Sequence, residues 1–118
     1  MRSRVFTRVN VSAKATISYG GDTIQGVTEN LSLQGLYLRL PKSIPVHNSI
    51  KVTLHCPKSV NMQVSGDVVR YDETGGMGVR IKSIDINSFV NLRNVIAQQC
   101  NDFNGIMTET YKMVDCIH

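Results

Sequence analysis

Two arginines stand four positions apart near the start of this sequence, in the segment RVFTR. If the segment is extended, Arg4 and Arg8 project from one side about 13 Å apart, and Val5 and Thr7 project from the other. A bend in the segment would bring both guanidinium groups around one ligand. Arginine binds phosphate through a planar fork of donors, reads guanine at O6 and N7, and stacks on purine rings. The arginine pair is therefore suited to an anionic partner such as a nucleic acid, a nucleotide or an acidic lipid headgroup.

A second polar group lies in the segment NLSLQG, which starts at Asn30. On an extended strand Asn30 and Ser32 share one face, while Leu31 and Leu33 enter the core. The Asn30 amide offers an acceptor and a donor, and Ser32 offers a hydroxyl, so an acceptor here can accept a hydrogen bond from N1–H or N2–H of guanine. Gly35 permits a tight turn and lets a ligand approach the backbone. This segment is the expected partner of the arginine pair.

The composition is that of one globular domain. The chain has 118 residues, of which 42% are apolar and 19% charged, and its net charge is +4. Arg2, Arg4 and Arg8 all precede the first acidic residue, Asp22, so the basic N-terminal end predicts an anionic partner. No apolar run is long enough to span a membrane, and the N-terminus lacks the apolar core of a secretory signal. We therefore expect a cytoplasmic protein.

Metal binding and catalysis are not indicated. The three cysteines, Cys56, Cys100 and Cys116, form no CxxC pair, and the three histidines do not complete a zinc pattern. Reduced thiols in a cytosolic protein explain them. No Ser/His/Asp or Cys/His grouping stands out, so we expect neither a metal, nor a cofactor, nor an enzyme.

The residues from Val9 to Lys82 alternate between apolar and polar side chains, which predicts strands. The GGD segment starting at Gly20 predicts a hairpin turn. Gly26 and Gly66 lie inside strands, where glycine often marks a bend of the kind that a closing barrel needs. We expect an all-β fold, a six-stranded antiparallel barrel, which leaves no exposed strand edge. The six expected strands are residues 9–19, 23–32, 36–40, 49–56, 60–71 and 77–81.

The period changes to that of a helix after Lys82. Asp85 or Asn87 can cap a helix, and the following apolar residues recur at helical spacing, which predicts a C-terminal α-helix over residues 86–100 that covers one open end of the barrel. The residues after Asn101 fit either a short second helix or a tail that pairs with another copy. The expected organisation is an N-terminal arm (1–9), a barrel (10–82) and a helix (86–100), which together form a domain over 1–100, followed by the segment 101–118.

The ordered combination of these motifs resembles a known family. RVFTR followed by NLSLQG is similar to the PilZ domain signature, R-x-x-x-R with [D/N]-x-S-x-x-G, and GMGVRI (76–81) followed by an amphipathic helix resembles the end of that domain. The resemblance covers about residues 2–100. It implies a six-stranded PilZ-type barrel that binds cyclic di-GMP, a bacterial second messenger.

The resemblance also implies roles for single residues. Arg4 and Arg8 would hold guanine and phosphate, and the other guanine would be held by Asn30, Ser32 and Gly35.

Two positions depart from the common family pattern. Ser3, preceded by Arg2, stands where many members have a further arginine, which leaves the ligand stoichiometry open. Asn30 takes a place often filled by aspartate, so a neutral acceptor replaces a charged one. Arg70 and Arg80 are further ligand candidates, because a barrel can bring their late strands near the N-terminal arm. Tyr37 and Tyr71 can either stack on a base or serve as barrel residues.

The predicted function is reception of cyclic di-GMP, with an arm that folds over the barrel when ligand binds and a signal passed to an unidentified effector protein. Two alternatives stay open. One is a PilZ-type adaptor that works by protein contact without nucleotide, and the other is a small nucleic-acid-binding barrel of the OB type. Aromatic residues at 6% and the absence of tryptophan disfavour nucleic acid. Either a monomer or a homodimer fits the sequence.

Overall fold

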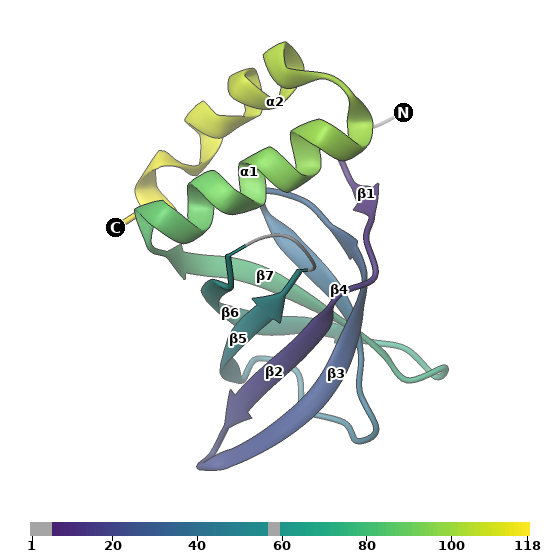
Figure 1. Ribbon diagram of the computed structural model, residues 1–118. Coiled ribbons are helices and arrows are strands. Elements are labelled where there is room, and N and C mark those ends of the chain that lie inside the picture. Colours follow the sequence, from purple (N-terminus) through teal and green to yellow (C-terminus); the bar gives the residue numbers. More distant parts are fainter. Residues whose placement is uncertain (1–5, 57–59) are drawn as a thin grey trace, which may run out of the picture.

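The computed structural model shows a barrel of antiparallel strands with helices over one end (Figure 1). It describes residues 6–56 and 60–118. The strands are β1 (Val9–Asn10), β2 (Lys14–Tyr19), β3 (Asp22–Leu31), β4 (Gly35–Arg39), β5 (Ser49–His55), β6 (Met62–Tyr71) and β7 (Gly76–Ile84). The helices are α1 (Ile86–Cys100), α2 (Phe103–Thr110) and the 3-10 helix η1 (Tyr111–Cys116).

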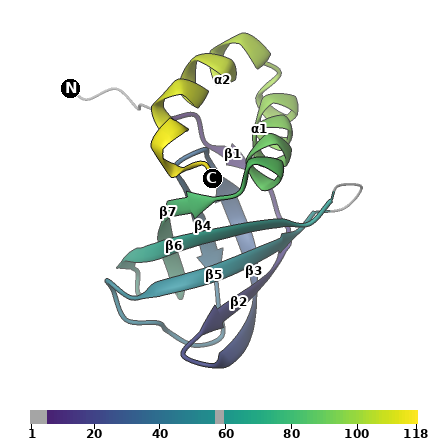
Figure 2. The ribbon, with the colours of Figure 1, turned by 90° about the vertical axis from the view of Figure 1, so that its left-hand side faces the viewer.

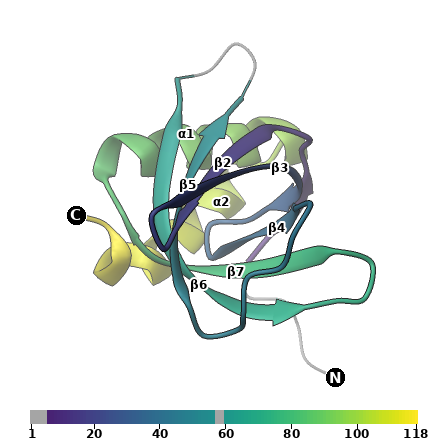
Figure 3. The same cartoon turned by 90° about the horizontal axis from the view of Figure 1, so that it is seen from below.

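The barrel is closed by the pairing of β3 with β4. The strands follow the order β1-β3-β2-β5-β6-β7-β4, and the additional β3–β4 pairing joins the two ends of this series. All neighbouring strands of the barrel are antiparallel. Figure 3 shows the barrel from below. The predicted six-stranded antiparallel barrel is thus confirmed for β2 to β7, and β1 adds a two-residue strand on the edge of β3.

The first expected strand, residues 9–19, is divided in the structure into β1 and β2. The side chain of Thr28 explains the division. Its buried hydroxyl accepts a hydrogen bond from the Ala13 backbone N–H at 2.9 Å and donates one to the Val11 carbonyl at 2.5 Å. Because this hydroxyl satisfies backbone groups between the two strands, the chain leaves the ladder there without unpaired polar groups.

The barrel interior is filled by the apolar side chains whose alternation predicted the strands. Ala15, Ile17, Leu38 and Leu54 are almost fully buried. The two-residue turn between β2 and β3 consists of Gly20 and Gly21, both at positive φ, which glycine adopts without a Cβ penalty. Other apolar side chains of β2 to β7 that are less than a tenth exposed are Ile24, Leu31, Leu36, Ile50, Val52, Met62, Val64, Val68, Met77, Val79, Ile81 and Ile84.

Helix α1 lies across one open end of the barrel (Figure 1) and buries Phe89, Leu92 and Ile96 against it. Of the two expected caps, Asp85 is the one used: its carboxylate accepts a hydrogen bond from the Ser88 backbone N–H at 3.0 Å. Hydrogen bonds from Ser88, first from its side chain and then from its backbone N–H, hold the pKa of the Asp85 carboxyl below its ordinary value. None of the helices in the described part of the chain is long and apolar enough to cross a membrane.

The residues after Asn101 form α2 and η1, which run back beside α1 above the barrel (Figure 2). Ile106 and Met113 anchor this segment in the core. Its end is fixed to the end of β7, because the backbone N–H of His118 donates to the Ile84 carbonyl at 2.9 Å. The C-terminal segment is therefore held at both ends.

We predict that Asp85→Ala lowers the free energy of unfolding by about 1 kcal/mol at pH 7, because the helix loses its side-chain cap. Since the folded pKa of Asp85 is depressed, the stabilisation is complete above the unfolded pKa of about 3.9 and is lost as pH falls through the folded value. Urea denaturation of both proteins between pH 7 and pH 3 measures this difference. Glu73→Ala, in an exposed turn, is the control. An undiminished difference at pH 3 would contradict a role for the carboxylate charge.

Candidate functional site

Five residues lie in one row across five neighbouring strands. The strand registers pair Asn10 with Asn30, Asn30 with Tyr37, Tyr37 with Gly78, and Gly78 with Arg70. Paired residues of antiparallel strands present their side chains on the same face, so the row brings two amides, a phenol ring and a guanidinium group onto the outside of the barrel. Tyr37 and Gly78, which are 41 positions apart in the sequence, are thereby placed side by side.

Arg8 joins this row beside Asn30 of β3. The pairing of β1 with β3 fixes the N-terminal arm beside Asn30, and Arg8 Nη1 donates a hydrogen bond to Asn30 Oδ1 at 3.3 Å. The Arg8 side chain is exposed, so most of its donors face solvent. Arg2, Ser3 and Arg4, the other predicted arm residues, lie outside the described residues.

Ser32 and Gly35 shape the turn between β3 and β4. Ser32 lies just beyond the end of β3 and is buried, and its hydroxyl accepts hydrogen bonds from the backbone N–H groups of Gln34 at 3.2 Å and Gly35 at 3.0 Å. The strand pattern predicts this side chain on the face beside Asn30, but turn geometry directs the hydroxyl to the backbone. At Gly35 a Cβ would lie 2.5 Å from the Val79 carbonyl oxygen, so the close approach of β4 and β7 requires glycine.

Arg70 and Tyr37 are stacked above Gly78. The Arg70 guanidinium carbon lies 5.4 Å from the centroid of the Tyr37 ring, which is cation–π geometry. A Cβ at Gly78 would lie 3.0 Å from Arg70 Cγ, so the missing side chain leaves room for the arginine to cross β7. The row thus offers a flat surface of a ring and a guanidinium plane, and both can stack on a purine base.

A hollow of about 200 Å³ opens beside this stack. Arg8 lines it from the N-terminal arm, Arg70 from β6 and Arg80 from β7, together with Ser32 and Gly35. Arg80 is in register with Gly35, which places its exposed side chain on the same side of the sheet as the turn. Among the described residues no acidic side chain lines the hollow, so its charge is positive. Such a site attracts phosphate or another anion.

A second hollow, of about 590 Å³, lies on the other side of Tyr37. Asn10, Asn30 and Arg39 are among its lining residues. The Glu29 carboxylate also lines it, but Arg39 Nε lies 2.9 Å from Glu29 Oε1 and neutralises that charge. Two hollows that share one aromatic ring fit a ligand with two flat groups better than either hollow alone would.

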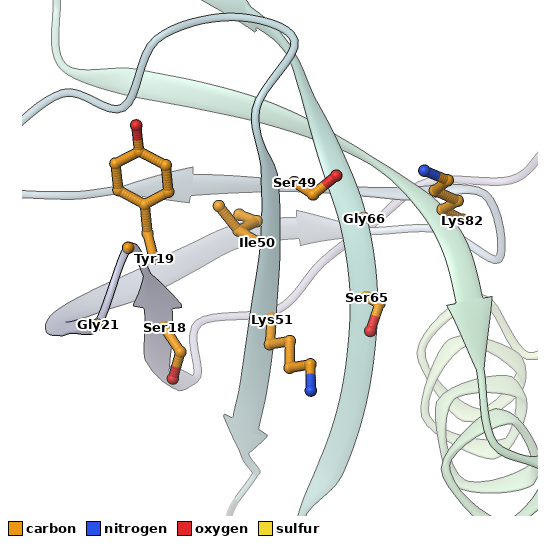
Figure 4. Close-up of a pocket in the computed structure, with 10 residues that line it drawn as sticks. Ser18, Tyr19, Gly21, Ser49, Ile50, Lys51, Ser65, Gly66 and Lys82 are labelled. Atoms are coloured by element: carbon orange, nitrogen blue, oxygen red, sulfur yellow. The ribbon is translucent and has the colours of Figure 1, made fainter.

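Another hollow, of about 380 Å³, lies away from the predicted residues and is lined by residues of β2, β5, β6 and β7 and of the turn after β2 (Figure 4). Lys51 and Lys82 are its charged residues, and Lys82 Nζ lies 4.0 Å from Asp67 Oδ2. It contains no arginine and none of the residues of the predicted signature. In the described part of the chain, no group of three or more His, Cys, Asp or Glu side chains is placed to hold a metal ion.

A sequence model of the PilZ domain family matches residues 2–98. The chain belongs to the PilZ domain family. A comparison with curated proteins found no match. PilZ domains act as receptor or adaptor domains.

Three solved structures support the same fold. The Bacillus subtilis inhibitor of motility (MotI/DgrA) is 18% identical with a TM-score of 0.71, and the alignment covers 86% of this chain but only 53% of that protein, so this chain spans about half its length. The PilZ domain of YcgR from Escherichia coli, solved with c-di-GMP, is 10% identical with a TM-score of 0.69 over 86% of this chain and 94% of that one. The PilZ domain of CeSA from a cellulose-synthesizing bacterium is 12% identical with a TM-score of 0.62 over 78% and 96%.

Gly78 is the site residue that the sequence analysis did not single out. A signal for it was present: in GMGVRI the two glycines stand two apart, so one face of that strand lacks side chains at both positions. Tyr37 covers the first of them, since a Cβ at Gly76 would collide with its ring, and Arg70 covers the second. In this strand the two glycines thus leave room for an aromatic and an arginine side chain from the neighbouring strands.

We predict that Gly35→Ala lowers the free energy of unfolding by about 1–3 kcal/mol, because the new Cβ would press on the Val79 carbonyl oxygen and force β4 and β7 apart. Urea denaturation measures the loss. Gln34→Ala, which shortens an exposed side chain in the same turn, is the control. If Gly35→Ala were as stable as the parent, the close strand contact would not be what requires glycine at this position.

Proposed function

We propose that this chain is a receptor for cyclic di-GMP. The observation that carries the proposal is the convergence of Arg8, Arg70 and Arg80 on one hollow beside the Asn30–Tyr37 row. The ligand has two negative charges and two guanines, so it needs both cationic forks and flat stacking surfaces. The structural neighbour from Escherichia coli that was solved with c-di-GMP supports this assignment by its fold.

Each residue of the site has its own role in binding the nucleotide. Arg8, together with Arg4 of the arm, binds guanine and phosphate, and Arg70 and Arg80 supply further positive charge at the base of the hollow. The Oδ1 atom of Asn30 accepts hydrogen bonds from the N1–H or N2–H groups of the second guanine. Ser32 and Gly35 act through the shape of the turn, because the Ser32 hydroxyl is engaged with backbone N–H groups.

The affinity that such a site can supply is sufficient for a second messenger. A hydrogen bond to a charged group contributes roughly 1.5–3 kcal/mol. Micromolar affinity requires only about −8 kcal/mol after the cost of ordering the ligand and the arm has been met. Three or four arginines provide this without a deep pocket.

We infer that residues 1–100 form the receptor unit and that residues 101–118 belong to its output side, in the cytoplasm. Binding draws the arginines of the arm onto the nucleotide, and the changed surface acts on a separate effector protein. A second candidate function is an adaptor that acts by protein contact alone. It is favoured by the exposed apolar side chains of α2 and η1, of which Phe103 is 54% and Tyr111 75% exposed.

Calorimetric titration with cyclic di-GMP distinguishes the two functions, with GTP and a short single-stranded oligonucleotide as competing ligands. Selective binding of cyclic di-GMP supports the receptor and gives the stoichiometry. Failure to bind it would remove the receptor function and leave the adaptor.

We predict that Arg8→Ala or Arg4→Ala costs about 2–5 kcal/mol of binding free energy, because each variant leaves ligand charge without its partner. The measurement is the same titration on purified variants of confirmed stability. Arg93→Ala on α1 is the matched control, since it removes an arginine that does not line the site. Parental affinity in both variants would show that the arm does not bind the nucleotide.

We predict that Asn30→Asp strengthens guanine binding by about 1 kcal/mol, since a charged acceptor forms stronger hydrogen bonds than a neutral one. The same change places a carboxylate at the position that accepts from Arg8 in the free protein, which holds that guanidinium more firmly. Comparison with Asn30→Ala separates the acceptor from the packing of the side chain. An affinity unchanged or reduced in Asn30→Asp would count against the acceptor role.

A further inference from the structure

The N-terminal arm is held by a residue from the opposite end of the chain. The Glu109 carboxylate accepts two hydrogen bonds from Thr7: one from the backbone N–H at 2.9 Å to Oε1, and one from the hydroxyl at 2.5 Å to Oε2. Both partners are half-buried, so water competes for these bonds less than it would at an exposed contact. A carboxylate that accepts two bonds from one residue fixes the position and the orientation of that residue.

A neighbouring contact holds the same part of the arm. Phe6 is 9% exposed and belongs to the apolar core, and Lys112 Nζ lies 5.9 Å from the centroid of its ring. Phe6 and Thr7 therefore both rest on the α2–η1 segment, residues 103–116. Arg8, the next residue, faces away from this segment toward Asn30. The arm is thus held from the C-terminal side while its arginine points to the hollow.

The α2–η1 segment is suited to serve as a fixed support. Ile106 and Met113 are buried on either side of Glu109. The helix start is capped by Asp102, which accepts from the Gly105 backbone N–H at 2.9 Å. The end of the segment is tied to β7 through His118 and Ile84. Glu109 therefore occupies a defined position relative to the barrel.

We propose that Glu109 is the positioning residue of the arginine arm: through Thr7 it keeps Arg8 at Asn30 before the nucleotide arrives. The gain is entropic, since residues ordered in the free protein need not be ordered on binding. By linkage, a ligand that fixes the arm also stabilises the α2–η1 segment. This role gives residues 101–118 a connection to the site, and its effect on affinity rests on the proposed function.

The first test needs no nucleotide. Hydrogen exchange of the Thr7 amide and ¹⁵N relaxation of Thr7 and Arg8 report directly on whether the arm is ordered. In the parent we expect a protected Thr7 amide, and in Glu109→Ala we expect protection to be lost at Thr7 while β3 keeps its own. A Thr7 amide that exchanges equally fast in both proteins would overturn the proposal, whatever ligand the chain binds.

The second test is the affinity for cyclic di-GMP. We expect Glu109→Ala to bind about tenfold more weakly. A loss of this size corresponds to the entropy cost of ordering the backbone of one residue on binding. Glu109→Gln keeps an acceptor for the Thr7 N–H but removes the charge, so it should bind at least as well as the parent, because a negative charge near a dianionic ligand is also lost. Asp115→Ala, on η1 and without a hydrogen bond or ion pair to residues 6–9, the described part of the arm, is the control for charge and should leave affinity unchanged.

A double variant separates the contact from general damage to the helix. If Thr7 and Glu109 act as one unit, then Thr7→Val combined with Glu109→Ala is no weaker than Glu109→Ala alone. Glu109→Gln as weak as Glu109→Ala, or additive effects of the two changes, would overturn the positioning role. If the parent does not bind cyclic di-GMP, the proposed function fails, and the exchange experiment still decides whether Glu109 orders the arm.

Discussion

The arrangement of the site depends on one strand, β4, which pairs with β3 on one side and with β7 on the other. This double pairing closes the barrel, and it also puts Tyr37 between Asn30 and Gly78. If β4 shifted by one residue, its side chains would exchange faces, and Tyr37 would enter the core in place of Leu36 or Leu38. The register is fixed because both leucines are almost fully buried and because position 35, which lies close to the Val79 carbonyl of β7, has room only for glycine. The packing of the core and the geometry of the site therefore both depend on the register of β4.

Much of the fold was predictable because its signals are local. Alternation of apolar residues predicted the strands, the Gly20–Gly21 pair predicted a hairpin, and the change of period after Lys82 predicted α1. The division of the first strand was not predictable, since it depends on the Thr28 hydroxyl, which reaches residues on another strand. The two registers that align Arg70 with Gly78 and Tyr37 are likewise long-range, and short-range periodicity carries no information about them.

The candidate site shows the same division between local and long-range information. The sequence alone indicated which residues to consider: Arg8, Asn30, Arg70 and Arg80 all lie at or beside one positively charged hollow. It also placed Ser32 on a strand face, where the structure has a buried turn residue, because the strand end is set by the approach of β4. The contact of Thr7 with Glu109 joins residues separated by 102 positions, and no local sequence motif predicts it.

A titration of the ¹⁵N-labelled chain with cyclic di-GMP, followed by NMR, would locate the bound nucleotide on the barrel. We expect the largest chemical-shift changes at the backbone amides of Arg8 and of the row Asn30, Tyr37, Gly78 and Arg70. Shift changes confined to the lysine-lined hollow of Figure 4, around Lys51 and Lys82, would contradict the proposed site, as would the absence of any change at saturating nucleotide.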